Sequence, residues 1–240
     1  MISIKQSNPQ KITPEFIVLS IECALIHTIL RMCKMGKQQD TISPLRDFVV
    51  GMTDLVSKEV EEATLLIKGS QLLKTLIQTD LWLPEFCTIP HPDFYQQFLL
   101  HADPLERFSV VSFVWGPGQK TPIHDHCVWG LIGVLRGAEM GQRYKRLKSD
   151  ELVKDGAETL LHPGDIDAVS PSIGDIHVVS NAFPDKTSIS IHVYGSNIGA
   201  IKRHTYDAIT GISKNFVSGY SSNQIPNLWD RSAEIRSTFS

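Results

Sequence analysis

The sequence has few cysteines, no cluster of basic residues and no long uninterrupted apolar run. Its four cysteines, Cys23, Cys33, Cys87 and Cys127, form no Cys-x-x-Cys pair and follow no regular spacing. A disulfide framework or a structural zinc site is therefore not expected, and four separate packed thiols in a reducing cytoplasm fit better. The net charge is −3 without a block of Lys or Arg, which gives no sign of a nucleic-acid-binding surface.

One segment, residues 16–35, is apolar enough to raise the question of a membrane. Glu22, His27 and Arg31 interrupt it, and a charged side chain at the centre of a bilayer costs about 2.5–3.5 kcal/mol even on lenient scales. No small-residue cleavage site follows, so a signal peptide is not favoured either. We expect no membrane span, but an amphipathic or partly buried helix within an N-terminal extension, residues 1–40, of unknown role.

Residues 41–240 are expected to form one domain, because 240 residues suffice for one well-buried domain with an appendage. Its first part, residues 41–90, is predicted to be helical. From Phe108 onward, short β segments alternate with Gly and Pro, a rhythm typical of an all-β sandwich or barrel. The sequence thus predicts a mainly β fold, with a barrel at about residues 105–200 and a small helical N-terminal part.

Two helices are predicted in the lead-in. Ser43-Pro44 is typical of a helix start, and a second helical pattern covers residues 60–79. The apolar residues at helical spacing are Leu45, Phe48, Val49, Met52 and Leu55 in the first segment, and Leu65, Leu66, Leu72, Leu73 and Leu76 in the second.

The pair His124-Asp-His126 carries the clearest chemistry. Residues i and i+2 of a strand face the same side, so both imidazoles are expected to point into the barrel, while Asp125 and Cys127 point away. His177, which follows a turn at Gly174, is the candidate third ligand. Three imidazoles suit several first-row divalent metals, among them Fe, Zn, Ni and Cu.

The surroundings of these histidines resemble the paired motifs of the cupin superfamily. The first segment has the motif's Gly and His positions, and the second has its Pro, Gly, His and Asn, with one extra residue after the Pro; the matching residues are Gly118, His124, His126, Gly130 and Gly137, then Pro171, Gly174, His177 and Asn181. The resemblance implies a double-stranded β-helix, or jelly-roll, barrel.

Gly130 makes the resemblance to one branch of the cupins more specific. Many cupins carry a Glu ligand there, and a site of three histidines without a carboxylate is the mark of the thiol dioxygenase branch. The segment HDHCVWGLIGVLRGAE, residues 124–139, is very similar to the bacterial cysteine and 3-mercaptopropionate dioxygenases, and the likeness runs from about Leu45 to Asp207. It implies one Fe(II) per chain and partners limited to a small thiol and O2, with both oxygen atoms added to sulfur to give a sulfinic acid.

Ser190, His192 and Tyr194 share one strand face by their spacing of two, so they are able to hydrogen-bond in a row. The resemblance implies that this catalytic relay lies beside the iron. It also implies an uncrosslinked Tyr194, since Gly130 stands where animal cysteine dioxygenases have the Cys of the crosslink. The alternatives for His192 are a fourth metal ligand or an ordinary core histidine.

Two residues are candidates for binding the substrate. Gln97 stands where animal cysteine dioxygenases have a carboxylate-binding Arg, and Arg203 lies nine residues after Tyr194, as in enzymes resembling 3-mercaptopropionate dioxygenase. An Arg fork suits a carboxylate because it binds both oxygens. The alternatives are a solvated surface charge for Arg203 and a plain polar residue for Gln97. This pattern favours 3-mercaptopropionate as substrate, with cysteine second.

Two other functions stay open from the sequence. The chain could be a metal-binding cupin without turnover, acting as a sensor or binding module, or a cupin oxygenase for a larger carbon substrate. Trp115 and Trp129 are expected to pack in the barrel. The histidines without a motif are expected in loops or on the surface, and these are His91, His101, His162 and His204. The sequence predicts no oligomeric state.

Overall fold

The computed structural model describes residues 42–58, 61–149, 151–222 and 232–239. Residues 44–240 belong to one compact unit. The apolar segment 16–35 lies outside the described residues. Within the described part of the chain, no helix combines the length and the apolar character needed to cross a membrane.

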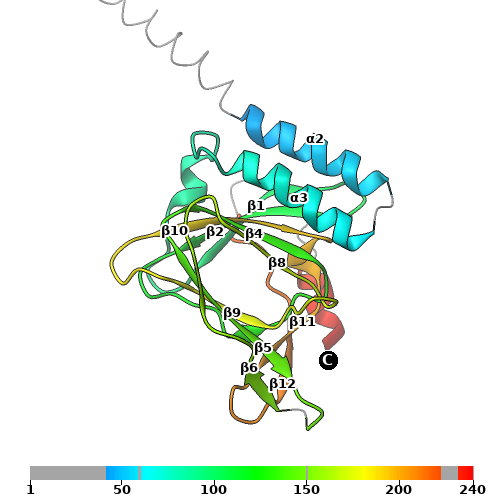
Figure 1. Cartoon of the computed structure of the whole chain (residues 1–240), viewed down its shortest axis with the longest axis vertical. Coiled ribbons are helices and arrows are strands. Elements are labelled where there is room, and N and C mark those ends of the chain that lie inside the picture. The colour runs from blue at the N-terminus through cyan, green and yellow to red at the C-terminus, as the bar shows by residue number, and fades with distance from the viewer. Residues whose placement is uncertain (1–41, 59–60, 150, 223–231, 240) are drawn as a thin grey trace, which may run out of the picture. The chain divides into compact units, whose positions relative to one another are not determined.

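Both predicted lead-in helices are present. Helix α2 is Ser43–Ser57 and helix α3 is Glu62–Leu76, and most of the apolar positions predicted for them are buried. Val49 and Leu72 are only half-buried. The two helices lie side by side next to a β-sheet (Figure 1).

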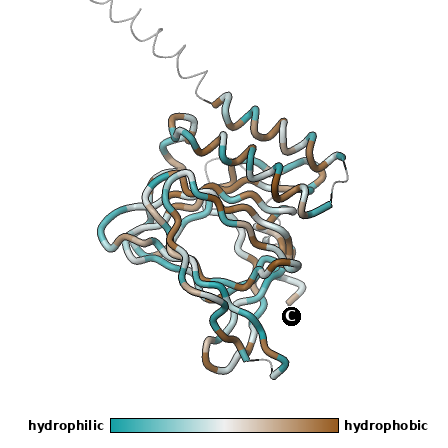
Figure 2. The backbone as a smooth tube through the Cα atoms, in the orientation of Figure 1, coloured by the Kyte–Doolittle hydropathy of each residue, from teal (hydrophilic) through white to brown (hydrophobic). Residues whose placement is uncertain are grey.

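Helix α3 packs on the outer face of that sheet, through glycines that allow close approach. A Cβ on Gly133 would lie 3.1 Å from Leu73 and 3.0 Å from Ile77. A Cβ on Gly69 would lie 2.9 Å from Leu131. The hydropathy colouring in Figure 2 shows hydrophobic segments along the helices and the strands beneath them.

Two antiparallel sheets form the body of the fold. The first has the order β1-β2-β10-β4-β8, with β1 Gln96–Ala102, β2 Ser109–Trp115, β10 Ser188–Tyr194, β4 Gly130–Arg136 and β8 Ile166–Val169. The second has the order β12-β11-β3-β9-β5-β6, with β7 paired to β5; its strands are β12 Ser213–Phe216, β11 Arg203–Tyr206, β3 Ile123–His124, β9 His177–Asn181, β5 Glu139–Arg146, β6 Leu152–Lys154 and β7 Thr159–Leu161. The short helical segments are η1 Glu85–Thr88, η2 Ile198–Ala200, α4 Ser232–Arg236 and η3 Ser237–Phe239.

This architecture confirms the predicted mainly β, cupin-type fold with a small helical N-terminal part. The strands extend beyond the range 105–200 on both sides, because β1 precedes it and β11 and β12 follow it. The five-stranded sheet and the second sheet curl around a common interior (Figure 1).

Alternation along the strands decides which residues line this interior. Val111, Phe113 and Trp115 of β2 cluster with Tyr194 of β10, Val179 of β9 and Ile198. Every residue of β2 and β10 is buried, since η1 and the helices cover the outer face. Apolar and aromatic side chains therefore line the interior, and a few polar side chains project into it.

Candidate metal site

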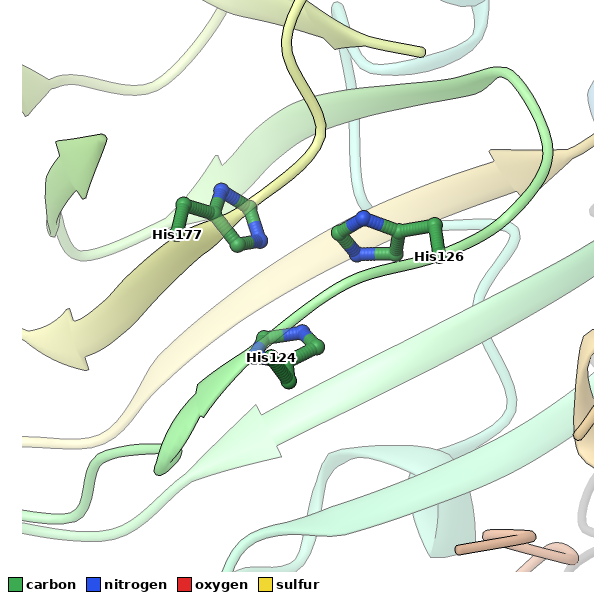
Figure 3. Close-up of side chains that lie close together, drawn as sticks. All are labelled: His124, His126 and His177. Carbon is green, nitrogen blue, oxygen red and sulfur yellow. The ribbon is translucent and has the colours of Figure 1, made fainter. Parts of the chain in front are cut away.

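Three imidazoles converge inside the barrel. His124 and His177 are direct partners in the ladder between β3 and β9, so their side chains share a face. His126 follows two residues after His124, and the three ring centroids lie 4.8–4.9 Å apart. Figure 3 shows the three rings pointing toward one another from two segments. One ligand nitrogen from each ring lies within 4.8 Å of the others, so the group could hold a metal ion.

Backbone carbonyls orient two of these rings. Nδ1 of His124 lies 3.1 Å from the Pro122 carbonyl oxygen, and Nδ1 of His126 lies 3.0 Å from that of Asp175. A carbonyl only accepts, so each Nδ1 carries the hydrogen and each Nε2 presents a lone pair. Nε2 of His126 is buried without a hydrogen-bond partner among the described residues. A buried acceptor left in this state is what a metal ligand requires.

The protonation state also suits a metal. Burial lowers the pKa of His124 to about 4, with a further contribution from the Arg203 charge. Burial and the neighbouring imidazoles lower the pKa values of His126 and His177 well below the ordinary value. All three rings are therefore neutral near pH 7, and no proton has to leave before a cation binds.

A tight turn after His126 is held by Asp175. Cys127 has a positive φ of 59°, a conformation that costs energy for a residue with a side chain. The Asp175 carboxylate compensates by accepting the N–H groups of His126 (3.1 Å) and Cys127 (3.0 Å). Cys127 is exposed and lies outside the histidine cluster, in agreement with its predicted orientation.

Ser190, His192 and Tyr194 form a hydrogen-bonded row on the interior face of β10. Ser190 Oγ lies 2.7 Å from His192 Nε2, and His192 Nδ1 lies 2.8 Å from the Tyr194 hydroxyl. Burial lowers the pKa of His192 to about 3, so this ring is neutral as well. Both of its nitrogens are engaged, which leaves none for a metal in this arrangement. The Tyr194 ring lies 5.4 Å from that of His126 and nearly parallel to it.

Gly130 lies opposite Tyr194 in the ladder between β4 and β10. A Cβ at this position would lie 2.9 Å from Tyr194 Cδ1 and 3.0 Å from Val169 Cγ2, closer than side chains normally approach. The absence of a side chain at Gly130 therefore has a steric reason. Burial raises the pKa of Tyr194, so its hydroxyl keeps its proton.

Arg203 is a buried cation. Its side chain is 4% exposed, Nη2 donates to Ser218 Oγ at 2.7 Å, and the guanidinium lies 4.6 Å from the centre of the Phe216 ring. Nε is buried without a hydrogen-bond partner, and none of the described carboxylates lies within ion-pair distance. Arg203 is therefore not a solvated surface charge. Its charge lowers the pKa values of His124 and His126, so it acts on the metal site.

Gln97 lies in β1, directly opposite Phe113 of β2. Its neighbours two positions away, Tyr95 and Leu99, pack on the interior cluster, and Gln97 shares their face by alternation. The Phe113 ring stacks on His192 at 4.1 Å between centroids. The structure thus places Gln97 on the interior side, half-buried, with the relay on the other side of Phe113.

Several features were missed from the sequence. Trp115 packs in the barrel as expected, but its Nε1 also donates to Ser190 Oγ at 3.2 Å. Glu139 is 1% exposed, and neither carboxylate oxygen makes a hydrogen bond of regular geometry with another described residue, although Ser190 and Trp115 lie close enough to affect its pKa. The expectation of loop or surface positions was wrong for His101 and His204, which lie half-buried in strands β1 and β11; Nδ1 of His204 is 2.7 Å from Asp125 Oδ2. Of these features, only the buried Glu139 had a signal in the sequence, because a glutamate at an inward-facing position of a strand is unusual.

No family model matches the chain. Among solved structures, an uncharacterised protein with a double-stranded β-helix domain from Klebsiella pneumoniae is 21% identical, covers 48% of this chain and 89% of its own, and has a TM-score of 0.38. A cupin superfamily protein from Desulfitobacterium hafniense is 13% identical, with 45% and 83% covered and a TM-score of 0.35. An oxalate oxidase is 16% identical, with 44% and 53% covered and the same TM-score of 0.35. At these values the likeness concerns the arrangement of strands, and nothing about activity is taken from it.

Proposed function

We propose that this protein is an Fe(II)-dependent thiol dioxygenase of the cytoplasm that adds both atoms of O2 to the sulfur of a small thiol carboxylate. The preferred substrate is 3-mercaptopropionate, which becomes 3-sulfinopropionate. The observation that carries this proposal is the buried Arg203, which has no ionic partner among the described residues and acts on the same interior as three neutral histidines. A site so arranged favours a ligand with one metal-binding end and one anionic end.

His124, His126 and His177 would hold the iron. Their donor set is neutral, so it leaves the full charge of the cation in place, and none of the described carboxylates belongs to this cluster. When bound, Fe(II) supplies a site at which the thiol loses its proton and O2 is activated next to the sulfur. The apolar walls formed by Val111, Phe113 and neighbouring residues keep bulk water from this reaction.

Arg203 would bind the substrate carboxylate. A buried charge without an ionic partner is costly. The Nε–H of Arg203 has no hydrogen-bond partner among the described residues, and a substrate carboxylate that accepts from it would remove part of that cost. Phe216 holds the plane of the guanidinium, which restricts where the carboxylate binds. Gln97, on the interior face of β1, would contact the middle of the substrate rather than its charged end.

The Ser190–His192–Tyr194 row would control one proton next to the reacting atoms. Trp115 only donates, so the Ser190 oxygen accepts from it and the Ser190 hydrogen is available for His192 Nε2. His192 Nδ1–H then donates to the Tyr194 oxygen. With the hydrogen bonds donated in this order, the Tyr194 hydroxyl hydrogen would be available to donate to a substrate atom bound at the metal.

Oxygen uptake by the Fe(II)-loaded protein tests the proposal. We expect thiol-dependent uptake with 3-mercaptopropionate, a lower kcat/KM with L-cysteine, and a sulfinic acid as product. Arg203→Met, which keeps the bulk of the side chain, should raise KM for 3-mercaptopropionate about tenfold or more because a buried charge pair is lost. A higher kcat/KM for cysteine would reverse the substrate ranking. Binding of Zn or Ni without any thiol-dependent uptake would favour the non-catalytic metal-binding protein instead.

A further inference from the structure

Arg203 and the histidines belong to different strands, and few backbone bonds join these strands. Strand β11 pairs with β3 at two positions, Thr205 with His124 and Tyr206 with Ile123. Extended in the same register, this ladder would place His204 opposite Asp125 and Arg203 opposite His126. Strand β3 ends at His124, so the regular ladder stops before it reaches Arg203.

The Asp125 side chain continues the connection where the ladder stops. The Asp125 N–H donates to the His204 carbonyl at 3.1 Å, and the His204 N–H donates to Asp125 Oδ1 at 2.7 Å. In a regular ladder that second bond would go to a backbone carbonyl. The carboxylate therefore replaces one backbone acceptor at the position next to Arg203.

Asp125 also binds the outward side chains of β11. Its Oδ2 lies 2.7 Å from Nδ1 of His204 and accepts the Tyr206 hydroxyl at 2.7 Å. The Asp125 side chain is 9% exposed and that of His204 36%, so the bonds that join them are partly shielded from water and from salt. One side chain, located between two metal ligands and pointing away from them, thus joins the metal-binding segment to the strand that carries the guanidinium.

We propose that Asp125 is a positioning residue that fixes Arg203 relative to the three histidines, and so selects thiol carboxylates of matching length. This inference rests on the proposed function. Asp125 lies outside the cluster of three histidines, and it acts through the register of β11. A guanidinium displaced by about 1 Å no longer reaches the carboxylate of a thiol whose sulfur is held at the metal.

Equilibrium binding under nitrogen tests this inference without turnover. Calorimetry on the Fe(II)-loaded chain compares 3-mercaptopropionate with 1-propanethiol, which has the same length and no carboxylate. We expect Asp125→Ala to weaken binding of 3-mercaptopropionate about tenfold while changing that of 1-propanethiol less than about twofold. In an Arg203→Met background, the same substitution should add less than about twofold, because both changes remove one interaction.

Asp207→Ala is the matched control. Asp207 belongs to the same hairpin and its Oδ1 also accepts three hydrogen bonds, from Ile209 N–H, Thr210 N–H and the Thr210 hydroxyl, but none of them reaches β3. We expect it to leave both affinities unchanged. Should Asp125→Ala fail to fold, Tyr206→Phe removes a single bond to Asp125 and should lower the preference for 3-mercaptopropionate about twofold to threefold. An unchanged preference in Tyr206→Phe would then overturn the inference.

The outcomes separate the inference from the proposed function. An equal loss of affinity for both thiols in Asp125→Ala, or losses that add fully with Arg203→Met, would overturn the positioning role alone. The selective binding of 3-mercaptopropionate by the unaltered chain would still stand. Equal binding of the two thiols by the unaltered chain would overturn both, since no carboxylate clamp would exist to be positioned.

Discussion

The burial of Glu139 predicts how the stability of the metal-free fold depends on pH. Burial raises the pKa of Glu139 from 4.5 to about 7, and the nearby polar groups of Ser190 and Trp115 lower the value only in part. Between pH 4.5 and 7 the folded chain therefore keeps a proton that the unfolded chain releases. The contribution of Glu139 to the free energy of unfolding falls as the pH rises through this window, and it levels off above about pH 7.

The magnitude follows from the size of the shift. One pKa unit corresponds to 1.36 kcal/mol, so Glu139 lowers the stability by roughly 3 kcal/mol between pH 4 and pH 8. Glu139→Gln has nearly the same shape and no ionisation. We expect the variant to gain about this amount relative to the unaltered chain across the window, since all other groups titrate equally in both proteins.

Urea unfolding of the metal-free protein between pH 5 and pH 8 measures this difference. The metal is removed because a bound cation would itself lower the pKa of a buried carboxylate. Glu158→Gln, at a side chain that is 53% exposed and near Lys154, is the control for the loss of a carboxylate at the surface. A constant difference for Glu139→Gln would show that the native carboxylate is ionised at pH 5 and would refute the reasoning.

Three further outcomes are expected. His177→Ala should abolish stoichiometric iron binding, measured by metal analysis, because two remaining imidazoles hold a divalent ion poorly; retained iron would mean that another residue is a ligand. Tyr194→Phe should slow oxygen uptake and leave the iron content intact, whereas loss of iron would remove Tyr194 from the relay. Gly130→Ala should destabilise the fold by about 1–3 kcal/mol in denaturant unfolding, because the new methyl group would be forced against Tyr194; an unchanged midpoint would mean that the ring yields easily.

The parts of the site that could be predicted follow from the period of a strand. His124 and His126, and likewise Ser190, His192 and Tyr194, are two residues apart, so the sequence alone places each set on one face. The helices could be predicted because their apolar residues recur at helical spacing. Each of these inferences uses only neighbours within a few positions.

The parts that could not be predicted depend on pairing between distant strands. Asp125 and His204 are 79 residues apart, and no local pattern brings them together. The burial of Arg203 follows from the path of β11, whose four residues, RHTY, lack an apolar alternation. Strand β1 has the sequence QQFLLHA, in which apolar and polar residues do not alternate, so its place at the sheet edge is decided by β2.

The close contact between Gly130 and Tyr194 has a consequence for motion. The phenol ring lies close to the Gly130 backbone and nearly parallel to the His126 ring, 5.4 Å between centroids. Rotation about its Cβ–Cγ bond would require these neighbours to separate, so ring flips should be slow. Packing alone thus restricts the rotation of the Tyr194 ring, with the same effect as a covalent bond to a neighbouring residue. The hydroxyl is therefore oriented as soon as the chain has folded, without a covalent bond to the ring.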